Sequence, residues 1–429
     1  TSLAGILRHA WKDKKEDLLE SAASCGDVEK GRGDSKLSVS WGHIHDSRNR
    51  PVAFRASKGR LDDDLLRSAR DLIVRPHVRI NHQGVADARE HGLFDECLVP
   101  RGHRFTFELE LGFDEEEKSR GYDGVLNHVL SLLNTPSTRI GAKTRSGLGA
   151  FKIVECRRRL FSLVSDRDFQ DYAKLPRAIE RAVSDEILPV IDPVQSEEDA
   201  VRTVTIEGTP RGFWIVAGGV EQEEDRLVKH DGEENSAEAP DMVTWRESRV
   251  LWKGAQGSFC LNEAQALIPG SSIKGALRHR TQFHLNALNG VFADEIQDPK
   301  KLEEHGANKS HDLAPLFGDV PSDPDTELRA CRGKVIVDDV VPQNPKGPFL
   351  QQHVVIDRFS GGALEGMLFD EAPLWGGEWS LKIHLLEDEA MDENLKTAFA
   401  RAIEDLAEGR LALGGGSGRG YGRFQGTPH

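Results

Sequence analysis

The sequence predicts an α+β protein built from two tandem copies of one unit. Three segments of the first half recur in the second half in the same order; the matched pairs are 1–9 with 271–279, 93–96 with 368–371, and 140–151 with 413–424. The corresponding offsets are 270, 275 and 273 residues. Three collinear matches at nearly one offset indicate an internal duplication rather than a chance similarity of glycine-rich stretches.

Each copy contains the same series of predicted elements. A short helix comes first, with serine or threonine positioned to cap it. A strand and a long hairpin follow, and then a strand whose apolar residues alternate with polar ones, at 105, 107, 109 and 111 and again at 379, 381, 383 and 385. This period of two predicts one buried face. An amphipathic helix at 125–133 and at 395–406, a glycine-rich loop and a short strand complete each copy.

The second copy also shows what precedes the first helix. Residues 201–206 and 213–216 have the composition of strands, which gives the order β-α-β-β-α-β of a ferredoxin-like or RRM-like sheet with helices on one face. The first copy has no counterpart of these segments, so we expect its opening strand and loop to lie before the first residue. We assign 1–164 to a first domain, 165–200 to a linker with a helix at 176–187, and 201–429 to a second domain.

Composition excludes several classes of protein. Of the 429 residues, 38% are hydrophobic and 30% charged, which allows packed cores and excludes wholesale disorder. The net charge of −15 excludes a uniformly basic nucleic-acid coat but leaves room for a local basic groove. Five scattered cysteines without a CxxC pair argue against a zinc ribbon or a disulfide framework, so a cytoplasmic location is the expectation. No apolar run approaches the ~18 residues of a membrane span, so no membrane partner is expected.

The first candidate binding motif is the run IPGSSIKGALR at 268–278. Pro-Gly favours a turn, the serines are expected to cap a helix, and the N–H groups of a helix start suit a phosphate. An ordinary capped helix with a solvated basic face explains this motif alone equally well. The expected RNA-binding residues are Ser271, Ser272, Lys274 and Arg278, with Ser2 and Arg8 at the matching positions of the first copy.

The second candidate motif is the glycine-rich loop near the end of each copy. Glycine allows positive φ and a close approach to a ligand, and successive N–H groups can form an anion nest. No GK[ST] follows and the loop lies between a helix and a strand, so it is neither a Walker A loop nor a dinucleotide fingerprint. A flexible linker is the alternative, which the recurrence weakens. The candidate RNA-binding residues are Lys143, Arg145, Gly147, Gly415, Gly416 and Arg419.

The third candidate is the hairpin insertion of each copy, at 77–105 and 353–379. Long insertions in compact domains are usually functional. Each hairpin contains Leu-Phe-Asp-Glu, so its expected functional residues are Leu93 and Phe94, and Leu368 and Phe369.

Two other features favour structure over function. Trp379, near Trp375, continues an alternating core pattern, and the pair His43 and His45 has no third metal ligand in register, which favours a polar strand end.

Together the three motifs resemble the RAMP superfamily (repeat-associated mysterious proteins). The phrase IPGSSIKGALR, the Leu-Phe-Asp-Glu hairpin and the closing GGGSGRGYGRF are most similar to the backbone subunits of type III CRISPR effector complexes. Two such units in one chain resemble the tandem, fused backbone proteins of type III-D-variant and type III-E systems. The likeness covers nearly the whole chain except the linker and residues 287–313.

The resemblance implies a subunit that binds guide RNA through its phosphates and presents a thumb hairpin from each unit to the duplex of guide and target RNA. Its implied partners are guide RNA, single-stranded target RNA, and the other RAMP backbone, small and large subunits of the complex. Some units of this kind cut target RNA with a metal ion, Mg²⁺ or Mn²⁺, and an aspartate in the loop before the first helix.

Asp241 is the candidate for both catalysis and metal binding. Residues 241–246 are similar to the Asp-x-x-x-x-Arg loop of cutting units, although a longer stretch, 247–267, separates them from Pro269. The alternative is that Asp241 merely ends the acidic run 221–240, with Asp225 and Asp231 as fallback residues.

Two further functions stay open on sequence alone. One is a backbone subunit without chemistry. The other is a stand-alone guide-processing endoribonuclease of the same superfamily, for which His9 and His43 are the candidate catalytic histidines; a nucleotide-binding enzyme fits the loop context less well. Residues 221–241 carry nine acids against two bases, whereas basic residues gather around 143–159 and 274–280. We therefore expect a narrow basic track on an acidic body.

Overall fold

The structure, a computed structural model of the 429-residue chain, describes residues 36–52, 62–81, 83–87, 92–119, 125–175, 186–188, 201–218, 240–259, 264–308, 310–319, 330–386 and 391–429. Several sequence-based predictions lie outside these residues. They are the first helix with Ser2, Arg8 and His9, the fallback residues Asp225 and Asp231, and the 176–185 part of the linker helix.

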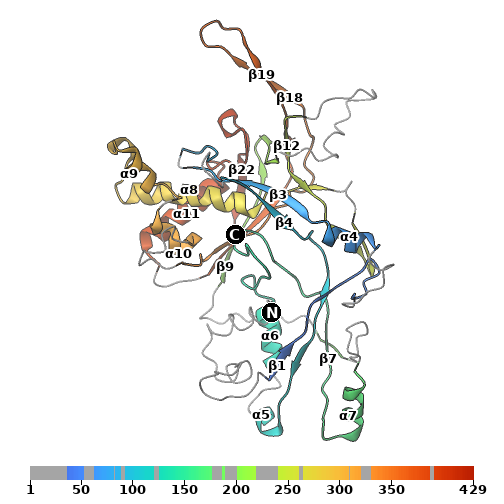
Figure 1. Ribbon diagram of the computed structural model, residues 1–429. Helices are drawn as coiled ribbons and strands as arrows, with labels where there is room; N and C mark the ends of the chain where they lie inside the picture. The colour runs from blue at the N-terminus through green and yellow to red at the C-terminus, as the bar shows by residue number, and fades with distance from the viewer. Residues whose placement is uncertain are drawn as a thin grey trace.

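The second unit is built around a four-stranded antiparallel sheet with the strand order β17-β21-β9-β22 (Figure 1). Its strands are β9 (Val201–Pro210), β17 (Val335–Val337), β21 (Trp379–Leu386) and β22 (Phe424–Pro428), and its long helices are α8 (Gly270–Leu288) and α11 (Glu393–Ala407). The chain visits these elements in the order β9, α8, β17, β21, α11, β22. This is the strand and helix order that the sequence predicts, and the α+β class is confirmed.

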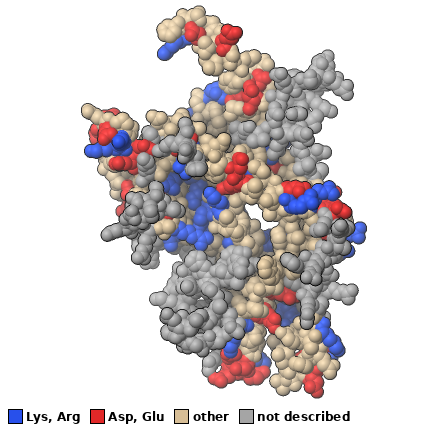
Figure 2. Space-filling view, in the orientation of Figure 1, with Lys and Arg blue, Asp and Glu red and all other residues tan. Residues whose placement is uncertain are grey.

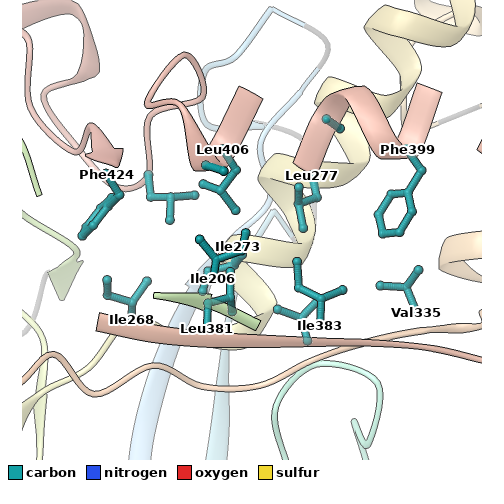
Figure 3. Packing of buried hydrophobic residues seen from close by; sticks show 14 of the residues in the cluster. Ile206, Ile268, Ile273, Leu277, Val335, Leu381, Ile383, Phe399, Leu406 and Phe424 are labelled. Atoms are coloured by element: carbon teal, nitrogen blue, oxygen red, sulfur yellow. The ribbon is translucent and has the colours of Figure 1, made fainter. Parts of the chain in front are cut away.

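The core of the second unit lies between α8, α11 and the sheet (Figure 3). Along β21, Trp379, Leu381 and Ile383 are buried while Ser380 and Lys382 are exposed, so the predicted period of two holds as far as Ile383; beyond it His384 is buried and Leu385 is half-buried. Burying each large apolar side chain contributes about 1.5–3 kcal/mol. Helix α11 contributes the predicted apolar face and begins at Asp392, whose carboxylate accepts a hydrogen bond from the N–H of Leu395 at 3.0 Å.

The first unit has a smaller core. Helix α6 (Val125–Leu133) packs on β1 (Leu37–Val39) and β6 (Leu109–Leu111), which pair antiparallel. The strand predicted from 105 to 111 is in fact two short strands, because β5 (Phe105–Thr106) pairs with β2 (His43–Ile44) whereas β6 pairs with β1. As a result Phe105 is 54% exposed instead of continuing the core.

Both predicted hairpins are present. The first joins β3 (Ile73–Val78) to β4 (Leu93–Leu98), and the second joins β18 (Gln351–Ile356) to β19 (Ala363–Ala372). The second hairpin projects from the body, and its base forms a sheet with β11 (Ala217–Gly218) and β12 (Met242–Thr244), in the order β11-β12-β19-β18 (Figure 1). The first hairpin contacts the second unit, where the side-chain amide of Asn308 donates to the carbonyl of Ile80 at 2.6 Å.

The segment predicted to be a linker contains more structure than expected. Helix α7 (Asp166–Ala173) begins at Ser165, and β7 (Cys156–Arg158) pairs antiparallel with β8 (Glu186–Leu188). The predicted helix is therefore wrong at 186–187, where pairing with a strand about thirty residues earlier supplies the backbone hydrogen bonds that a helix would have supplied locally.

Short elements complete the fold. Three pairs of short strands are β10 (Phe213–Trp214) with β20 (Leu374–Trp375), β13 (Arg246–Glu247) with β16 (Gln265–Ala266), and β14 (Val250–Lys253) with β15 (Gln256–Phe259). The short helices are α4 (Asp64–Arg70), α5 (Glu115–Ser119), α9 (Pro299–Glu304) and α10 (Ala314–Phe317), and the 3₁₀ turns are η5 (Ala293–Glu295), η6 (His311–Leu313) and η7 (Ser417–Arg419). Across the described parts of the chain, no helix combines the length and apolar character needed to span a membrane.

The histidine pair of the first unit has a structural role, as the sequence favours. The ring nitrogens of His45 lie 3.0 Å from Asn49 Oδ1 and 2.7 Å from Thr106 Oγ1, and His43 Nδ1 lies 3.0 Å from the carbonyl of Val52.

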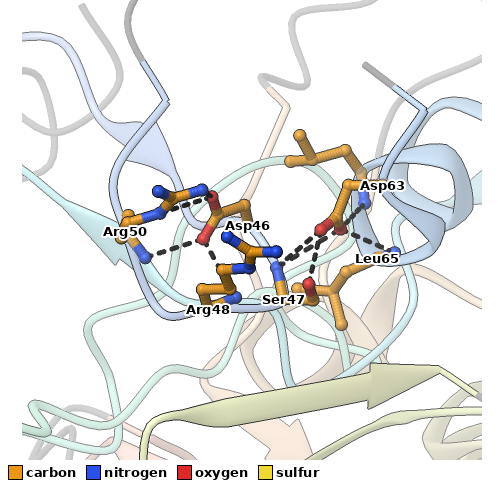
Figure 4. Close-up of polar contacts among 7 residues, drawn as sticks. Asp46, Ser47, Arg48, Arg50, Asp63 and Leu65 are labelled. Atoms are coloured by element: carbon orange, nitrogen blue, oxygen red, sulfur yellow. Dashed lines mark hydrogen bonds and ion pairs between the residues drawn. The ribbon is translucent and has the colours of Figure 1, made fainter. Parts of the chain in front are cut away.

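The turn that follows the histidine pair is held by hydrogen bonds to two carboxylates (Figure 4). Asp46 accepts from Arg48 and Arg50, and Asp63 accepts from Ser47 and from the start of α4.

Candidate nucleic-acid interface

The two glycine-rich loops have the same backbone shape. Four positions with positive φ recur at an offset of 273 residues: Gly141 and Gly414 (94° and 84°), Lys143 and Gly416 (54° and 69°), Gly147 and Gly420 (96° and 90°), and Gly149 and Gly422 (76° and 71°). Both loops are closed by the same bond, from Ile140 N–H to Gly149 and from Leu413 N–H to Gly422, each at 2.9 Å. The duplication inferred from the sequence is therefore visible in the backbone, and a flexible linker does not describe these loops.

Hydrogen bonds anchor the second loop to the unit around it. The N–H groups of Gly415 and Gly422 donate to carbonyls of Ile215 and Phe213, next to β10, at 2.8 and 2.9 Å. The N–H groups of Arg419, Gly420 and Tyr421 donate within the loop. These bonds use five N–H groups of the loop, and the side chain of Arg419 adds positive charge to it.

Cations from both units meet where the first glycine-rich loop approaches α8. Lys274 and Arg278 lie on α8, and the charge of Arg145, from the first unit, is close enough to lower the pKa of Lys274. Arg139 and Arg332 in turn lower the pKa of Arg145. Figure 2 shows Lys and Arg gathered beside α8 on a surface that carries acidic residues elsewhere. The predicted basic track on an acidic body therefore has a counterpart, and it includes both units.

These cations are partly buried, and no carboxylate among the described residues lies within ion-pair distance of them, although the charge of Asp319 acts on Arg278. Lys274 Nζ donates to the carbonyl of Val335 at 3.1 Å, and Arg278 donates to the carbonyls of Ala307 and Gly318 at 2.8 and 3.3 Å. Arg145 buries Nε and Nη1 without a hydrogen-bond acceptor among the described residues. Burial, followed by the neighbouring positive charges, lowers the pKa of Lys274 to about 7 and that of Arg145 to about 10. A phosphate would relieve this repulsion and accept the unused N–H groups.

The start of α8 differs from the prediction. Pro269 is the N-cap residue, with φ −62° and ψ 135°, and it makes no side-chain cap, so the serines lie inside the first turn and the predicted serine cap is wrong. The reason is tertiary, because Asp339, in the loop after β17, accepts from the N–H of Gly270 at 2.7 Å. Ser272 is exposed, and Ser271 Oγ is buried without a partner in the described structure. An internal carboxylate thus occupies the helix end expected to receive a phosphate.

Asp241 lies at the base of the second hairpin. It is exposed, directly before β12, and its Oδ2 accepts from the N–H of Asp370 at 2.9 Å. Among the described residues, no three His, Cys, Asp or Glu side chains come together as metal ligands. A Mg²⁺ ion at Asp241 would therefore need oxygen ligands from RNA phosphate and water, which is common for this metal. Leu368, on the same hairpin, is 68% exposed.

Aromatic residues at the hairpin bases occupy varied environments. Trp379 is buried as predicted, whereas Trp375 is 42% exposed, with its ring edge against Phe213. Phe94 is stacked on His77 at 5.2 Å and 14°, and Phe369 on His353 at 5.0 Å and 22°.

The sequence analysis missed four residues that flank these phenylalanines: His77, Glu96, His353 and Glu371. Glu96 Oε2 lies 3.2 Å from His77 Nε2, and Glu371 Oε2 lies 3.1 Å from His353 Nε2. The same glutamates form ion pairs with Lys143 and Arg419 of the glycine-rich loops. The signal was present, since each glutamate is the fourth residue of the repeated Leu-Phe-Asp-Glu and each histidine begins a hairpin.

Comparison with known protein families agrees with this duplicated architecture. No curated protein matches the chain. A solved chain described as a Type IV-B CRISPR Complex is 17% identical in sequence to this chain. The match covers 53% of this chain and 90% of the solved chain, with a TM-score of 0.32. The sequence profile of the RAMP superfamily matches residues 1–152 and 265–425, one stretch in each unit. Since these two stretches include well over half of the chain, the protein belongs to the RAMP superfamily.

Proposed function

We propose that this chain is a guide-RNA-binding backbone subunit of a type III CRISPR ribonucleoprotein, acting in antiviral defence. The observation that carries the proposal is the meeting of Arg145 with Lys274 and Arg278, from two units. Among the described residues no carboxylate lies within ion-pair distance of these cations, although the charge of Asp319 reaches Arg278. Such a cluster suits the phosphates of RNA, which are contacted irrespective of base sequence. Membership of the RAMP superfamily and the two equivalent glycine-rich loops support the same proposal.

The first test is the RNA that co-purifies with the native chain and its partner subunits. Sequencing should find guide RNA with a constant repeat-derived part, and crosslinking should map it to the glycine-rich loops and α8. The double variant Arg145→Gln/Lys274→Gln should bind RNA at least about tenfold more weakly, because each lost charge-assisted bond contributes roughly 1.5–3 kcal/mol. Lys300→Gln, an exposed lysine on α9, is the matched control and should bind like the native chain. Equal binding by all three proteins would contradict the proposal.

We also propose that the second unit cuts target RNA at Asp241 in a metal-dependent reaction. The supporting observation is the exposed carboxylate of Asp241, tied to the hairpin through the N–H of Asp370. The assembled complex with Asp241→Ala should bind target RNA normally but lose one set of cleavage products, while Asp294→Asn, an exposed acid on η5, should keep all of them. A complex with Asp241→Ala that still produces every product would leave a backbone subunit without chemistry as the better description.

A further inference from the structure

A four-residue cluster recurs on the two strands of each hairpin, here called the hairpin cluster. It contains Lys143, Phe94, His77 and Glu96 in the first unit, and Arg419, Phe369, His353 and Glu371 in the second. Each phenylalanine stacks on its histidine, with which it is paired across the hairpin. The loop cation lies over the same ring, with Lys143 Nζ at 5.4 Å and Arg419 Cζ at 5.8 Å from the ring centroid.

The cation of the cluster comes from a different loop position in each unit. At the offset of 273 residues that aligns the loop backbones, Lys143 corresponds to Gly416 and Arg419 corresponds to Ser146. The two side chains nevertheless reach the same place. The geometry is therefore reproduced although the residue positions are not, which indicates that this placement of a cation is itself required.

The two members of each ion pair differ in exposure. Glu96 and Glu371 are 17% and 0% exposed, whereas Lys143 and Arg419 are 56% and 43% exposed. Each glutamate directs Oε1 to the cation and Oε2 to the histidine ring nitrogen, a close contact that does not have hydrogen-bond geometry in the described structure. The cation, in contrast, has one side open to solvent and hence to a ligand.

We propose that Glu96 and Glu371 are counter-charges that hold the loop cations against the hairpins when no RNA is bound. A phosphodiester of single-stranded RNA then replaces the carboxylate as the partner of Lys143 and Arg419. This inference rests on the proposed function and adds how the same loops are kept from binding anions loosely. An ion pair that RNA must break lowers the affinity of the chain for RNA. An ion pair that only stabilises the loop conformation raises that affinity instead. The sign of the effect of removing the glutamate charge therefore separates the two roles.

The test is the affinity of the full chain for a single-stranded RNA oligonucleotide, measured by fluorescence anisotropy at low salt. Glu371→Gln keeps the side-chain shape and should bind the RNA about fivefold more tightly than the native chain. This factor is the upper end of what one ion pair near the surface contributes to an equilibrium. In an Arg419→Gln background the same substitution should have no effect, since no cation remains to be released. Glu365→Gln, an exposed glutamate on the same strand, is the control for a general change in charge.

Each outcome decides a specific point. Unchanged or weaker binding by Glu371→Gln overturns the counter-charge role, and so does tighter binding that persists without Arg419, because repulsion of RNA by any nearby acid explains it. If the native chain binds no single-stranded RNA, the proposed function fails and the counter-charge role fails with it. Thermal unfolding shows whether Glu371→Gln is folded. The equivalent pair Glu96→Gln and Lys143→Gln gives an independent cycle with the same expected signs.

Discussion

Arg75 of the first unit donates two hydrogen bonds to Glu247 of the second unit, at 2.6 and 2.9 Å. The same guanidinium donates to Asp339 at 3.0 Å. Arg75 is only 3% exposed, and although burial disfavours its charge, the two carboxylates raise its pKa. Since Asp339 also accepts from the start of α8 and lies against Gly147, these contacts set the first glycine-rich loop and α8 side by side.

Replacing Arg75 should weaken the union of the two units. Arg75→Ala leaves two carboxylates without their partner in a buried place, which costs about 3–5 kcal/mol. We expect a lower denaturant midpoint and faster proteolysis between the units. Arg67→Ala removes an exposed partner of Asp64 on α4 and should change the free energy of unfolding by less than about 1 kcal/mol. Equal stability of the two variants would show that the contact contributes little.

RNA affinity should fall with rising pH because of Lys274. The pKa of this ammonium is about 7 in the free protein, and a bound phosphate favours the charged form and so raises that pKa. Above about pH 7 binding therefore takes up a proton, and affinity drops by up to about tenfold per pH unit. Lys274→Arg stays charged over this range, so its affinity should vary less between about pH 6 and pH 9. Identical pH profiles for the two proteins would exclude proton uptake at Lys274.

Asp405 should make the second unit sensitive to acid. Burial alone would raise the pKa of this carboxyl, but hydrogen bonds from Arg410, His284 and Arg280 lower it to about 2. Because the folded pKa lies below the unfolded one, the stabilisation is complete above about pH 4 and is lost as pH falls toward 2. Asp405→Asn should cost about 2 kcal/mol at neutral pH and flatten the loss of stability between about pH 4 and pH 2.

The denaturant midpoint at several pH values measures this effect. Glu404→Gln changes the exposed neighbour on α11 and should keep the native profile. A native-like profile for Asp405→Asn would contradict the assigned cause.

Glycine is required at some loop positions but not at others. Gly422 has φ +71°, and a Cβ there would lie 2.0 Å from the carbonyl oxygen of Leu413. Gly422→Ala should therefore destabilise the chain by roughly 1–3 kcal/mol and weaken RNA binding. Gly418 has no atom near the position of a Cβ, so Gly418→Ala should leave the melting temperature almost unchanged. Thermal unfolding of the two variants checks this difference, and equal melting temperatures would contradict it.

The regular elements of the second unit follow closely from the sequence. The alternation at 379–383 and the helical spacing at 395–406 each describe one buried face, so local pattern and final burial agree there. The prediction fails where the partner is distant. A strand at 186–188 replaces the last two residues of a predicted helix because it pairs with β7. The serines before Ile273 do not cap α8, because Pro269 is the N-cap residue and Asp339 accepts from the N–H of Gly270.

The candidate site was predicted in part. Lys274, Arg278 and Arg145 stand out as basic residues beside turns, but composition does not reveal that they are partly buried with no carboxylate of the described residues at ion-pair distance. The hairpin clusters were missed because a histidine, a glutamate and a loop cation from three separate segments form each of them. The repeated Leu-Phe-Asp-Glu motif pointed to the phenylalanine as a functional residue, whereas the glutamate of the same motif was not among the predicted site residues.

By itself the sequence determined the duplication, the order of strands and helices in the second unit, and the recurrence of the glycine-rich loop, because periodicity and backbone freedom are local properties of the chain. The tertiary structure decided which charges face one another. Arg75 meets Glu247 across 172 residues, and Lys143 and Arg419 reach equivalent places from different loop positions. Ion pairs act over a few ångströms in space, and that distance depends on how the two units and their hairpins pack, which no local pattern in the sequence encodes.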